Sequence, residues 1–361
     1  ALLLPASGAG AASAELGGGS AARVGGSRML RLPAFQLLRP ATVAEATRML
    51  AELGPQAAPL AGGTDLLPKM KRRQLQPKYL VSLRGLRELR GWSGSPEQGL
   101  VLRAGCTLAE VAAQPAVRSA YRALAEAVAV CSNPILHRMG TLGGNLCLDT
   151  RCTYYDQTEQ WRQALGWCMK APGLRSPEEV PCRVAPGGSR CWAVSAGDGA
   201  PALIALGAKV RLVGARGERV LPLEDLYRDD GIRYLDKSPD ELVVEVLLPP
   251  ADGLRSTYRK VRRRGSLDFA ALGVAAALRL DPDGTVTSCR LVLGGVASRP
   301  LVLEEVASLL VGQRLEQDVL ERVSEAVYRA VHPMDNTDFT VLYRRRTAPV
   351  HVRRALEALA S

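Results

Sequence analysis

Four cysteines and a glycine-rich turn stand close together in the middle of this 361-residue sequence. The turn is Thr141-Leu142-Gly143-Gly144-Asn145, and glycines of this kind let backbone N–H groups close on an anionic ligand. An irregular segment follows, which contains Cys152, Cys168, Cys182 and Cys191. Four thiolates are the usual ligand shell of an iron–sulfur cluster. Residues 141–191 are therefore expected to bind two redox cofactors side by side.

The spacing of the four cysteines leaves the thiol chemistry open. No Cys-x-x-Cys pair occurs among them, whereas zinc ribbons and fingers typically use such pairs. Common ferredoxin spacings are also tighter than these. An iron–sulfur cluster, a zinc ion and four unligated thiols all stay possible from spacing alone. A long irregular segment inside a compact domain is usually functional or disordered, and the cysteines give residues 147–192 a reason to be ordered.

A second glycine turn, Gly62-Gly63-Thr64-Asp65, follows a short predicted strand at residues 58–61. It lacks the third glycine and the βαβ spacing of a dinucleotide-binding fingerprint, and no Gly-Lys-Ser/Thr follows it as in a Walker loop. A single Gly-Gly-Thr is more often a plain strand-to-helix turn. Two such turns, each leaving an α/β unit, favour a dinucleotide held from both sides.

The elements that must position these turns alternate between strand and helix. Capping-box patterns at Thr42–Glu45 and Thr107–Glu110 predict helix starts, and Gly54 ends the first helix. Apolar patterning predicts strands at residues 79–83, 100–104, 209–213 and 242–248, and helices at 116–129 and 200–206.

The last third of the chain changes from this alternation to strands followed by helices. We place a domain boundary at Pro249-Pro250, which divides the chain into residues 29–250 and 251–361. Strands are predicted at 256–261, 269–280 and 286–293, and helices at 301–311, 319–330 and 345–359. This order predicts an antiparallel sheet with helices on one face. Residues 1–28 are rich in Ala, Gly and Ser and are predicted to be a disordered leader, with Met29 a candidate natural start.

Composition excludes several function classes. No window approaches the roughly 18 uninterrupted apolar residues of a membrane span. No secretory signal pattern is present, so a cytoplasmic protein with reduced thiols is expected. The net charge of +11 would suit nucleic acid, but aromatics make up only 4% and no nucleic-acid-binding motif occurs. A solvated face, or a surface that meets acidic cofactors and an acidic electron donor, explains the charge better.

Together these motifs resemble the FAD-binding subunits of the molybdenum hydroxylase family, which includes xanthine and carbon monoxide dehydrogenases. The resemblance is carried by Leu60–Leu67, Thr141–Asn145, Asp198 ahead of Ala200-Pro201, Lys260 with Asp268, and Tyr343-Arg344-Arg345. It implies an α+β fold: a two-part FAD-binding domain of the vanillyl-alcohol-oxidase/PCMH type with a cysteine-bearing insertion, followed by the C-terminal sheet with helices on one face.

By this resemblance, the two glycine turns hold the FAD pyrophosphate and ribityl chain, and Asp198 and Lys260 lie near the flavin. Val244 packs near the isoalloxazine ring and Cys131 lines it. The implied chemistry is reversible flavin redox without a catalytic side chain. The FAD-binding residues are expected to be Leu60, Ala61, Gly62, Gly63, Thr64, Asp65, Leu66, Leu67, Cys131, Thr141, Leu142, Gly143, Gly144, Asn145, Asp198, Val244 and Lys260.

Most members of the family lack the insertion at 147–192, which is similar to the one in the β subunits of 4-hydroxybenzoyl-CoA reductases. There it carries a [4Fe–4S] cluster, and the match makes Cys152, Cys168, Cys182 and Cys191 its ligands, although the gap before Cys182 is longer here. The resemblance implies a hetero-oligomer. Electrons would pass from ferredoxin to the cluster, from the cluster to FAD, and from FAD to a small subunit with two 2Fe–2S clusters. They would then reach a molybdopterin-binding large subunit, which dehydroxylates 4-hydroxybenzoyl-CoA or a related aryl-CoA.

Two alternatives remain. The first is a dehydrogenase FAD subunit, like that of carbon monoxide or xanthine dehydrogenase, which passes electrons outward to NAD or a quinone while the insertion is vestigial or binds zinc. The second is a basic nucleic-acid-binding or scaffold protein. The other cysteines are expected to be packed residues, with Cys147 a possible substitute ligand, and the three histidines to be structural: Cys106, Cys131, Cys147, Cys289, His137, His332 and His351.

Overall fold

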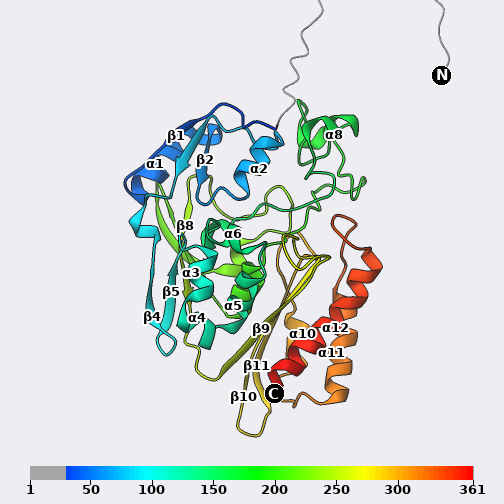
Figure 1. Cartoon of the computed structure of the whole chain (residues 1–361). Helices are drawn as coiled ribbons and strands as arrows, with labels where there is room; N and C mark the ends of the chain where they lie inside the picture. The colour runs from blue at the N-terminus through cyan, green and yellow to red at the C-terminus, as the bar shows by residue number, and fades with distance from the viewer. Residues whose placement is uncertain (1–29, 361) are drawn as a thin grey trace, which may run out of the picture. The chain divides into compact units, whose positions relative to one another are not determined.

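Apolar strands and threonine-capped helices build the first two thirds of the chain, and a computed structural model describes residues 30–360 (Figure 1). The predicted leader, residues 1–28, lies outside the described residues. The strands are β1 Gln36–Leu38, β2 Ala57–Leu60, β3 Tyr79–Ser82, β4 Trp92–Ser95, β5 Gly99–Arg103, β6 Lys209–Gly214, β7 Gly217–Pro222, β8 Leu242–Leu248, β9 Leu254–Val261, β10 Leu272–Leu280, β11 Val286–Gly294 and β12 Leu301–Val302. The α-helices are α1 Val43–Leu53, α2 Leu66–Lys71, α3 Leu108–Ala113, α4 Pro115–Ala120, α5 Arg122–Ala129, α6 Pro134–His137, α7 Leu142–Leu146, α8 Glu159–Ala164, α9 Gly199–Ala205, α10 Glu304–Ser308, α11 Gln317–Ala330 and α12 Val341–Ala360.

A three-stranded parallel sheet in the order β1-β3-β2 delivers the chain into the first glycine turn. The predicted cap of α1 is present, because the Thr42 hydroxyl accepts from the Glu45 N–H at 3.1 Å, and the helix ends at Gly54. Ala46 and Leu50 on α1 are buried in one apolar core with Val81 of β3 and Leu242 of β8. This packing fixes β2, and with it the turn that follows, against the larger sheet.

A five-stranded antiparallel sheet in the order β4-β5-β8-β6-β7 forms the second part of this region. Both hydrogen bonds of the predicted capping box at Thr107 and Glu110 are present at the start of α3. The helix predicted at 116–129 is wrong as one element, because Tyr121 leaves helical geometry (φ −120°, ψ 52°) and separates α4 from α5. The Tyr121 side chain is fully buried and donates to the Pro249 carbonyl at 2.8 Å, which holds the break in place.

The C-terminal sheet is antiparallel, in the order β12-β11-β10-β9, as predicted. Alternation along β10 gives it two apolar faces: Val274 and Ala276 belong to the core with α10–α12, while Ala275 and Ala277 belong to the core with α5 and α9. The helices that follow the sheet in sequence cover one face, and helices of the FAD-binding region cover the other. The helix predicted at 301–311 is shorter, because residues 301–302 pair with β11 instead.

Arg344 ties α12 to this sheet. Its side chain is 1% exposed and donates to the carbonyls of Ala271 at 3.0 Å and Met334 at 2.7 Å, and also to that of Gly295. Burial lowers the pKa of Arg344 to about 10, against the pull of Asp335. The guanidinium therefore serves as a buried hub for backbone carbonyls.

Replacing this hub should destabilise the fold. Arg344→Met removes the side-chain donor from the buried carbonyls of Ala271 and Gly295, so we expect the free energy of unfolding to fall by about 2–4 kcal/mol in urea denaturation. The neighbouring Arg345, which is half-buried and donates to the Tyr328 carbonyl, provides the control. Arg345→Met should cost less than about 1 kcal/mol. An equal loss in both variants would contradict the assignment of Arg344 as a hub.

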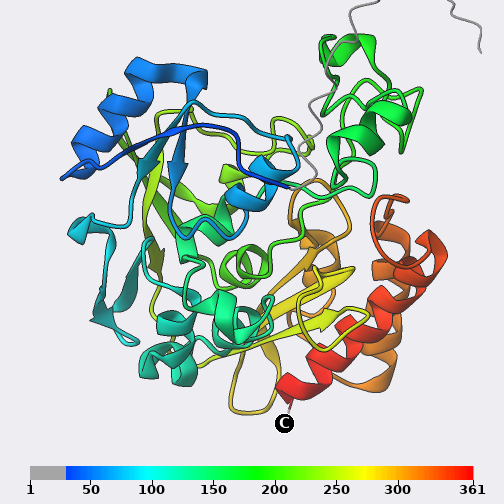
Figure 2. The same cartoon turned by 45° about the horizontal axis from the view of Figure 1, so that its top comes forward.

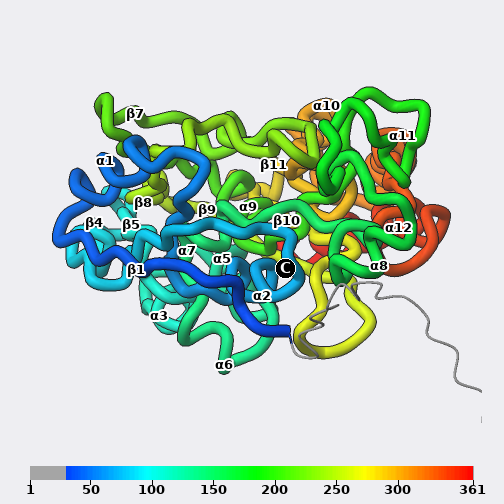
Figure 3. Tube along the Cα trace, turned by 90° about the horizontal axis from the view of Figure 1, so that it is seen from above, coloured from blue at the N-terminus to red at the C-terminus, as the bar shows by residue number. Residues whose placement is uncertain are grey.

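The insertion, residues 147–192, is largely irregular as predicted, apart from the single α-helix α8 and one 3-10 turn. It lies beside the C-terminal helices α11 and α12 (Figures 2 and 3). Thr153 donates its N–H to the Asn336 carbonyl at 3.0 Å, and the Asn336 side chain donates to the Trp192 carbonyl at 2.5 Å. Both ends of the insertion are thus fixed to one loop. No helix in residues 30–360 is long and apolar enough to cross a membrane.

Candidate functional site

The first glycine turn presents a run of free backbone donors. Within residues 30–360, the N–H groups of residues 62–66 donate no hydrogen bond to the protein, and the first N–H to do so is that of Leu67, which donates to the Gly63 carbonyl at 3.1 Å. The side chains of Leu60 and Leu67 flank Gly63 and hold the turn from both sides. Consecutive free N–H groups at the start of α2 form the concave donor surface that a phosphate group requires.

The second glycine turn differs from the prediction, because Thr141–Asn145 is the start of the short helix α7 and not a loop. The Thr141 hydroxyl caps the helix by accepting from the Gly144 N–H at 3.1 Å. The N–H groups of Leu142 and Gly143 donate to the carbonyls of Cys106 and Ala104, both at 2.8 Å. These donors are therefore already used within the protein. Gly144 is exposed, and a Cβ added there would meet only the Thr141 hydroxyl. This turn therefore lets a ligand come close to the backbone and does not supply a second set of donors.

The structure brings the two turns close together. A Cβ on Gly62 would lie 1.9 Å from the Met139 carbonyl oxygen, so only glycine fits at this contact. The Thr64 hydroxyl lies 3.5 Å from the position that a Cβ on Gly140 would take, just before Thr141. The free donors of the first turn and the open backbone at Gly144 can therefore face one elongated anionic ligand.

Beside α7 lies a buried polar cluster, which we define as Cys131, Asn145, Asp198, Tyr258 and Lys260. Lys260 Nζ and the Tyr258 hydroxyl each donate to Asp198 at 2.8 Å. The Asn145 amide accepts from the Gly199 N–H at 3.0 Å and donates to Cys131 Sγ at 3.5 Å. Asn145 is on α7, Cys131 follows α5 and Asp198 directly precedes α9, whereas Tyr258 and Lys260 are on β9 of the C-terminal sheet.

Burial dominates the electrostatics of this cluster. It raises the pKa of Asp198, against the pull of Lys260, and raises the pKa of the Cys131 thiol to about 12, with Asp198 adding to the effect. Cys131 is therefore a neutral thiol at neutral pH. Tyr258 was missed in the sequence because a tyrosine in a strand pattern carries no signal of its own.

Val244 belongs to a different part of the structure from the buried polar cluster. It is buried in the apolar core that contains Val43 of α1 and Val81 of β3. Asp268, part of the sequence resemblance, bonds Arg264 and not Lys260. The structure thus groups Cys131, Asn145, Asp198 and Lys260 and does not add Val244 to them.

The four cysteines of the insertion line one small cavity of about 10 Å³, together with Tyr154, Tyr155, Met169, Lys170, Arg183, Val184 and Ala193. All four are free thiols and are at most 8% exposed. Cys182, whose spacing fits the family least well, is on the cavity wall with the others. Cys147 is not, although its sequence position made it a possible substitute.

Burial favours the neutral thiol form of Cys152, Cys168 and Cys191 in this cavity. Burial raises the pKa of Cys152 to about 11 and that of Cys191 to about 12, and it raises the pKa of Cys168 as well. A metal ligand must be a thiolate, so loading this site releases protons. Within residues 30–360, no three His, Cys, Asp or Glu side chains converge as a site for one metal ion.

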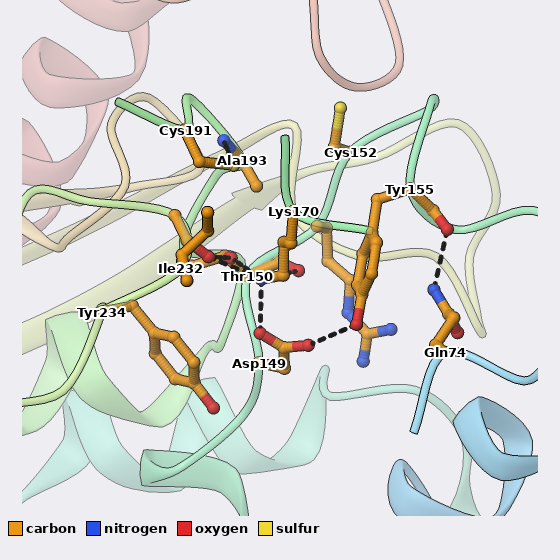
Figure 4. A network of polar contacts seen from close by, with 12 residues as sticks. Gln74, Asp149, Thr150, Cys152, Tyr155, Lys170, Cys191, Ala193, Ile232 and Tyr234 are labelled. Carbon is orange, nitrogen blue, oxygen red and sulfur yellow. Dashed lines mark hydrogen bonds and ion pairs between the residues drawn. The ribbon is translucent and has the colours of Figure 1, made fainter. Parts of the chain in front are cut away.

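A charged network adjoins the cavity (Figure 4). Asp149 accepts from Lys69 and Lys170, each at 2.5 Å, and from the Tyr155 hydroxyl at 3.3 Å. Burial alone would raise the pKa of Asp149, but the two lysines hold it at about 2. Lys170 also donates to the Gly231 carbonyl at 2.6 Å. Neither lysine nor Gly231 was singled out in the sequence, since the three segments meet only in the fold.

Comparison with known proteins identifies the family of this chain. Residues 33–251 match the family described as "FAD binding domain in molybdopterin dehydrogenase", and residues 256–359 match "CO dehydrogenase flavoprotein C-terminal domain". The chain belongs to this flavoprotein family. It is an FAD-binding oxidoreductase subunit of the molybdenum hydroxylase family, and its α+β fold is the one predicted.

Relatives cover nearly the whole chain. The aldehyde oxidoreductase FAD-binding subunit of Escherichia coli K12 is 33% identical over 88% of this chain and 96% of that protein. The carbon monoxide dehydrogenase medium chain of Afipia carboxidovorans is 28% identical over 90% and 96%. A solved carbon monoxide dehydrogenase from Hydrogenophaga pseudoflava matches with a TM-score of 0.74 and 25% identity over 91% of this chain and 98% of that one.

The descriptions of these relatives name FAD or a medium chain, and none names a [4Fe–4S] cluster or an aryl-CoA. FAD binding is thus a property of the family. The comparisons do not support the 4-hydroxybenzoyl-CoA reductase assignment, and they favour the dehydrogenase alternative.

Proposed function

We propose that this chain is the electron-transfer subunit of a molybdenum-containing dehydrogenase complex, and that it holds a [4Fe–4S] cluster in addition to FAD. The single observation that carries the cluster is the cavity walled by Cys152, Cys168, Cys182 and Cys191. In a four-iron cluster each thiolate binds a different iron, so the sulfurs surround the cluster and need not meet at one point. That arrangement suits this cavity better than a single zinc ion, for which four thiolates must converge.

FAD, when bound, supplies reversible one- and two-electron chemistry. The residues proposed to hold it are those of the two glycine turns, with the donors of residues 62–66 on the phosphates and Gly144 at the closest approach. The buried polar cluster of Cys131, Asn145, Asp198, Tyr258 and Lys260 is proposed to adjoin the flavin. Its role is to keep a fixed, water-excluded set of dipoles and charges beside the ring.

Partners are proposed from the same relatives. A subunit or a medium chain implies further chains, and we propose a molybdopterin-binding large subunit and a small subunit with 2Fe–2S clusters. The substrate site then lies on the large subunit. Relatives described as aldehyde oxidoreductase, carbon monoxide dehydrogenase and nicotinate dehydrogenase favour substrate oxidation, with electrons leaving to NAD or a quinone.

Reductive dehydroxylation of an aryl-CoA with ferredoxin as donor is the second candidate, and only the four-cysteine insertion favours it. The two directions differ in what the purified complex reduces. A dehydrogenase with bound FAD is reduced by an aldehyde or a similar small substrate and reoxidised by NAD or a quinone. A reductase consumes reduced ferredoxin only when an aryl-CoA is present.

Cofactor analysis of the purified full chain tests the proposal. We expect one FAD per chain and about four irons with about four acid-labile sulfides. One zinc without iron would overturn the cluster and leave FAD standing. A colourless chain that takes up no FAD would overturn the whole proposal.

A further inference from the structure

Two chains of polar contacts run from the segment after the first glycine turn to the cysteine-lined cavity. The first begins at Asp65, just before α2, the second begins at Lys69 on α2, and both end at a cavity cysteine. Neither is needed to explain how FAD or a cluster is held. They do, however, connect the two sites that the proposed function assigns to different cofactors.

The first chain passes through Arg151. Asp65, which precedes α2, does not cap that helix but forms an ion pair with Arg151. Arg151 also bonds Asp156 at 3.3 Å, and Asp156 accepts from the N–H of Cys152 at 3.1 Å. The Arg151 guanidinium lies 4.2 Å from the centre of the Phe269 ring, which covers it. The backbone of Cys152 is thereby fixed to a residue of the first glycine turn.

The second chain passes through Lys69 and Lys170. Lys69 on α2 bonds Asp149, and Asp149 bonds Lys170, which holds the Gly231 carbonyl. A Cβ on Gly231 would lie 2.7 Å from Cys191 Sγ, so this backbone presses directly on the thiol. Figure 4 shows Lys170 in the middle of this arrangement, with Asp149 on one side and Cys152 and Cys191 on the other.

These contacts leave the cavity cysteines and α2 little freedom to move independently of each other. The side chains of Lys69, Lys170 and Arg151 are 1%, 7% and 8% exposed. Separating a buried ion pair leaves an uncompensated buried charge, which is strongly unfavourable. A shift of Cys152 or Cys191 is therefore transmitted to Asp65 and α2, whose position sets the free N–H donors of the first turn.

We propose that Arg151 and Lys69 are positioning residues that couple the two sites, so that filling the cysteine cavity tightens FAD binding. This inference rests on the proposed function. Coupling of binding is reciprocal, so bound FAD must favour the filled cavity by the same factor. Without a cluster in the cavity, no shared ligand holds Cys152 and Cys191 in place. The two contact chains that end at these cysteines then hold α2 less firmly.

FAD titration of the full chain tests the coupling directly. The FAD-free chain is titrated with FAD by flavin fluorescence, once without metal and once after reconstitution with iron and sulfide. We expect FAD to bind at least about fivefold more tightly after reconstitution. In Arg151→Met, which removes one of the two contact chains, this ratio should fall. Arg190→Met is the matched control, because Arg190 also precedes a cavity cysteine but pairs with Asp229, away from α2.

Each outcome decides a different claim. Equal FAD affinity with and without iron and sulfide in the wild type would overturn the coupling and leave both cofactor sites intact. A ratio that falls equally in Arg151→Met and Arg190→Met would overturn the route through Arg151. A chain that binds no FAD in either state would overturn the proposed function itself. If Arg151→Met does not fold, Asp65→Asn removes the other end of the same ion pair and is expected to lower the ratio.

Discussion

Gly144→Val is expected to weaken FAD binding by at least about 100-fold, which corresponds to about 2.7 kcal/mol. Gly144 is exposed, and only the Thr141 hydroxyl lies near the position of an added Cβ. The added Cβ would lie 3.0 Å from this hydroxyl, which must shift by a few tenths of an ångström, and the rest of the valine side chain enters the space proposed for the ligand. The measurement is FAD per purified chain, with the dissociation constant from fluorescence titration.

A matched glycine separates this effect from a general loss of fold. Gly85 is also exposed, and no atom lies within 4 Å of an added Cβ. Gly85→Val should keep full FAD binding, and both variants should have near-wild-type melting temperatures. Normal FAD occupancy in Gly144→Val would remove the second glycine turn from the FAD site. Gly62→Ala is less informative, because a Cβ there collides with the Met139 backbone and disturbs the fold.

The sequence predicted the elements around the FAD site well where the signals are local. Capping at Thr42 and Thr107 and the apolar run of β8 depend on neighbours within a few residues, and all three are found as predicted. The break at Tyr121 was not predictable in this way. It depends on a hydrogen bond to Pro249, which is 128 residues away.

The two glycine turns also differ in a way that depends on distant contacts. Their sequences suggest equal contributions of backbone donors, yet residues 62–66 keep all of theirs free, whereas those of residues 142–145 are used within the protein. The donors of Leu142 and Gly143 are taken by Cys106 and Ala104, which pattern reading cannot place opposite them. Lys69, Lys170 and Gly231 escaped notice for the same reason, because three distant segments form their network. The position of the four cysteines within one irregular insertion did predict that they act together, since a long irregular segment needs a reason to be ordered.

Cys152→Ser is expected to abolish the iron and acid-labile sulfide of the purified chain while sparing its FAD. A serine hydroxyl is a far poorer ligand for iron than a thiolate, and burial raises the pKa of the Cys168 and Cys191 thiols, which favours their neutral form without a complete site. The chain should still bind FAD because residues 62–66 and Gly144 do not line the cavity, although the proposed coupling should lower the FAD affinity about fivefold.

Two further cysteines make this test specific. Cys182→Ser should lose as much iron as Cys152→Ser, because Cys182 is on the same cavity wall in spite of its unusual spacing. Cys147→Ser should keep all of its iron, since Cys147 lies outside that wall although it is only five positions before Cys152. Iron retained in Cys182→Ser and lost in Cys147→Ser would exchange the two as ligands. Iron retained in every variant would place the metal elsewhere, and the four buried thiols would then be packing residues that happen to share a cavity.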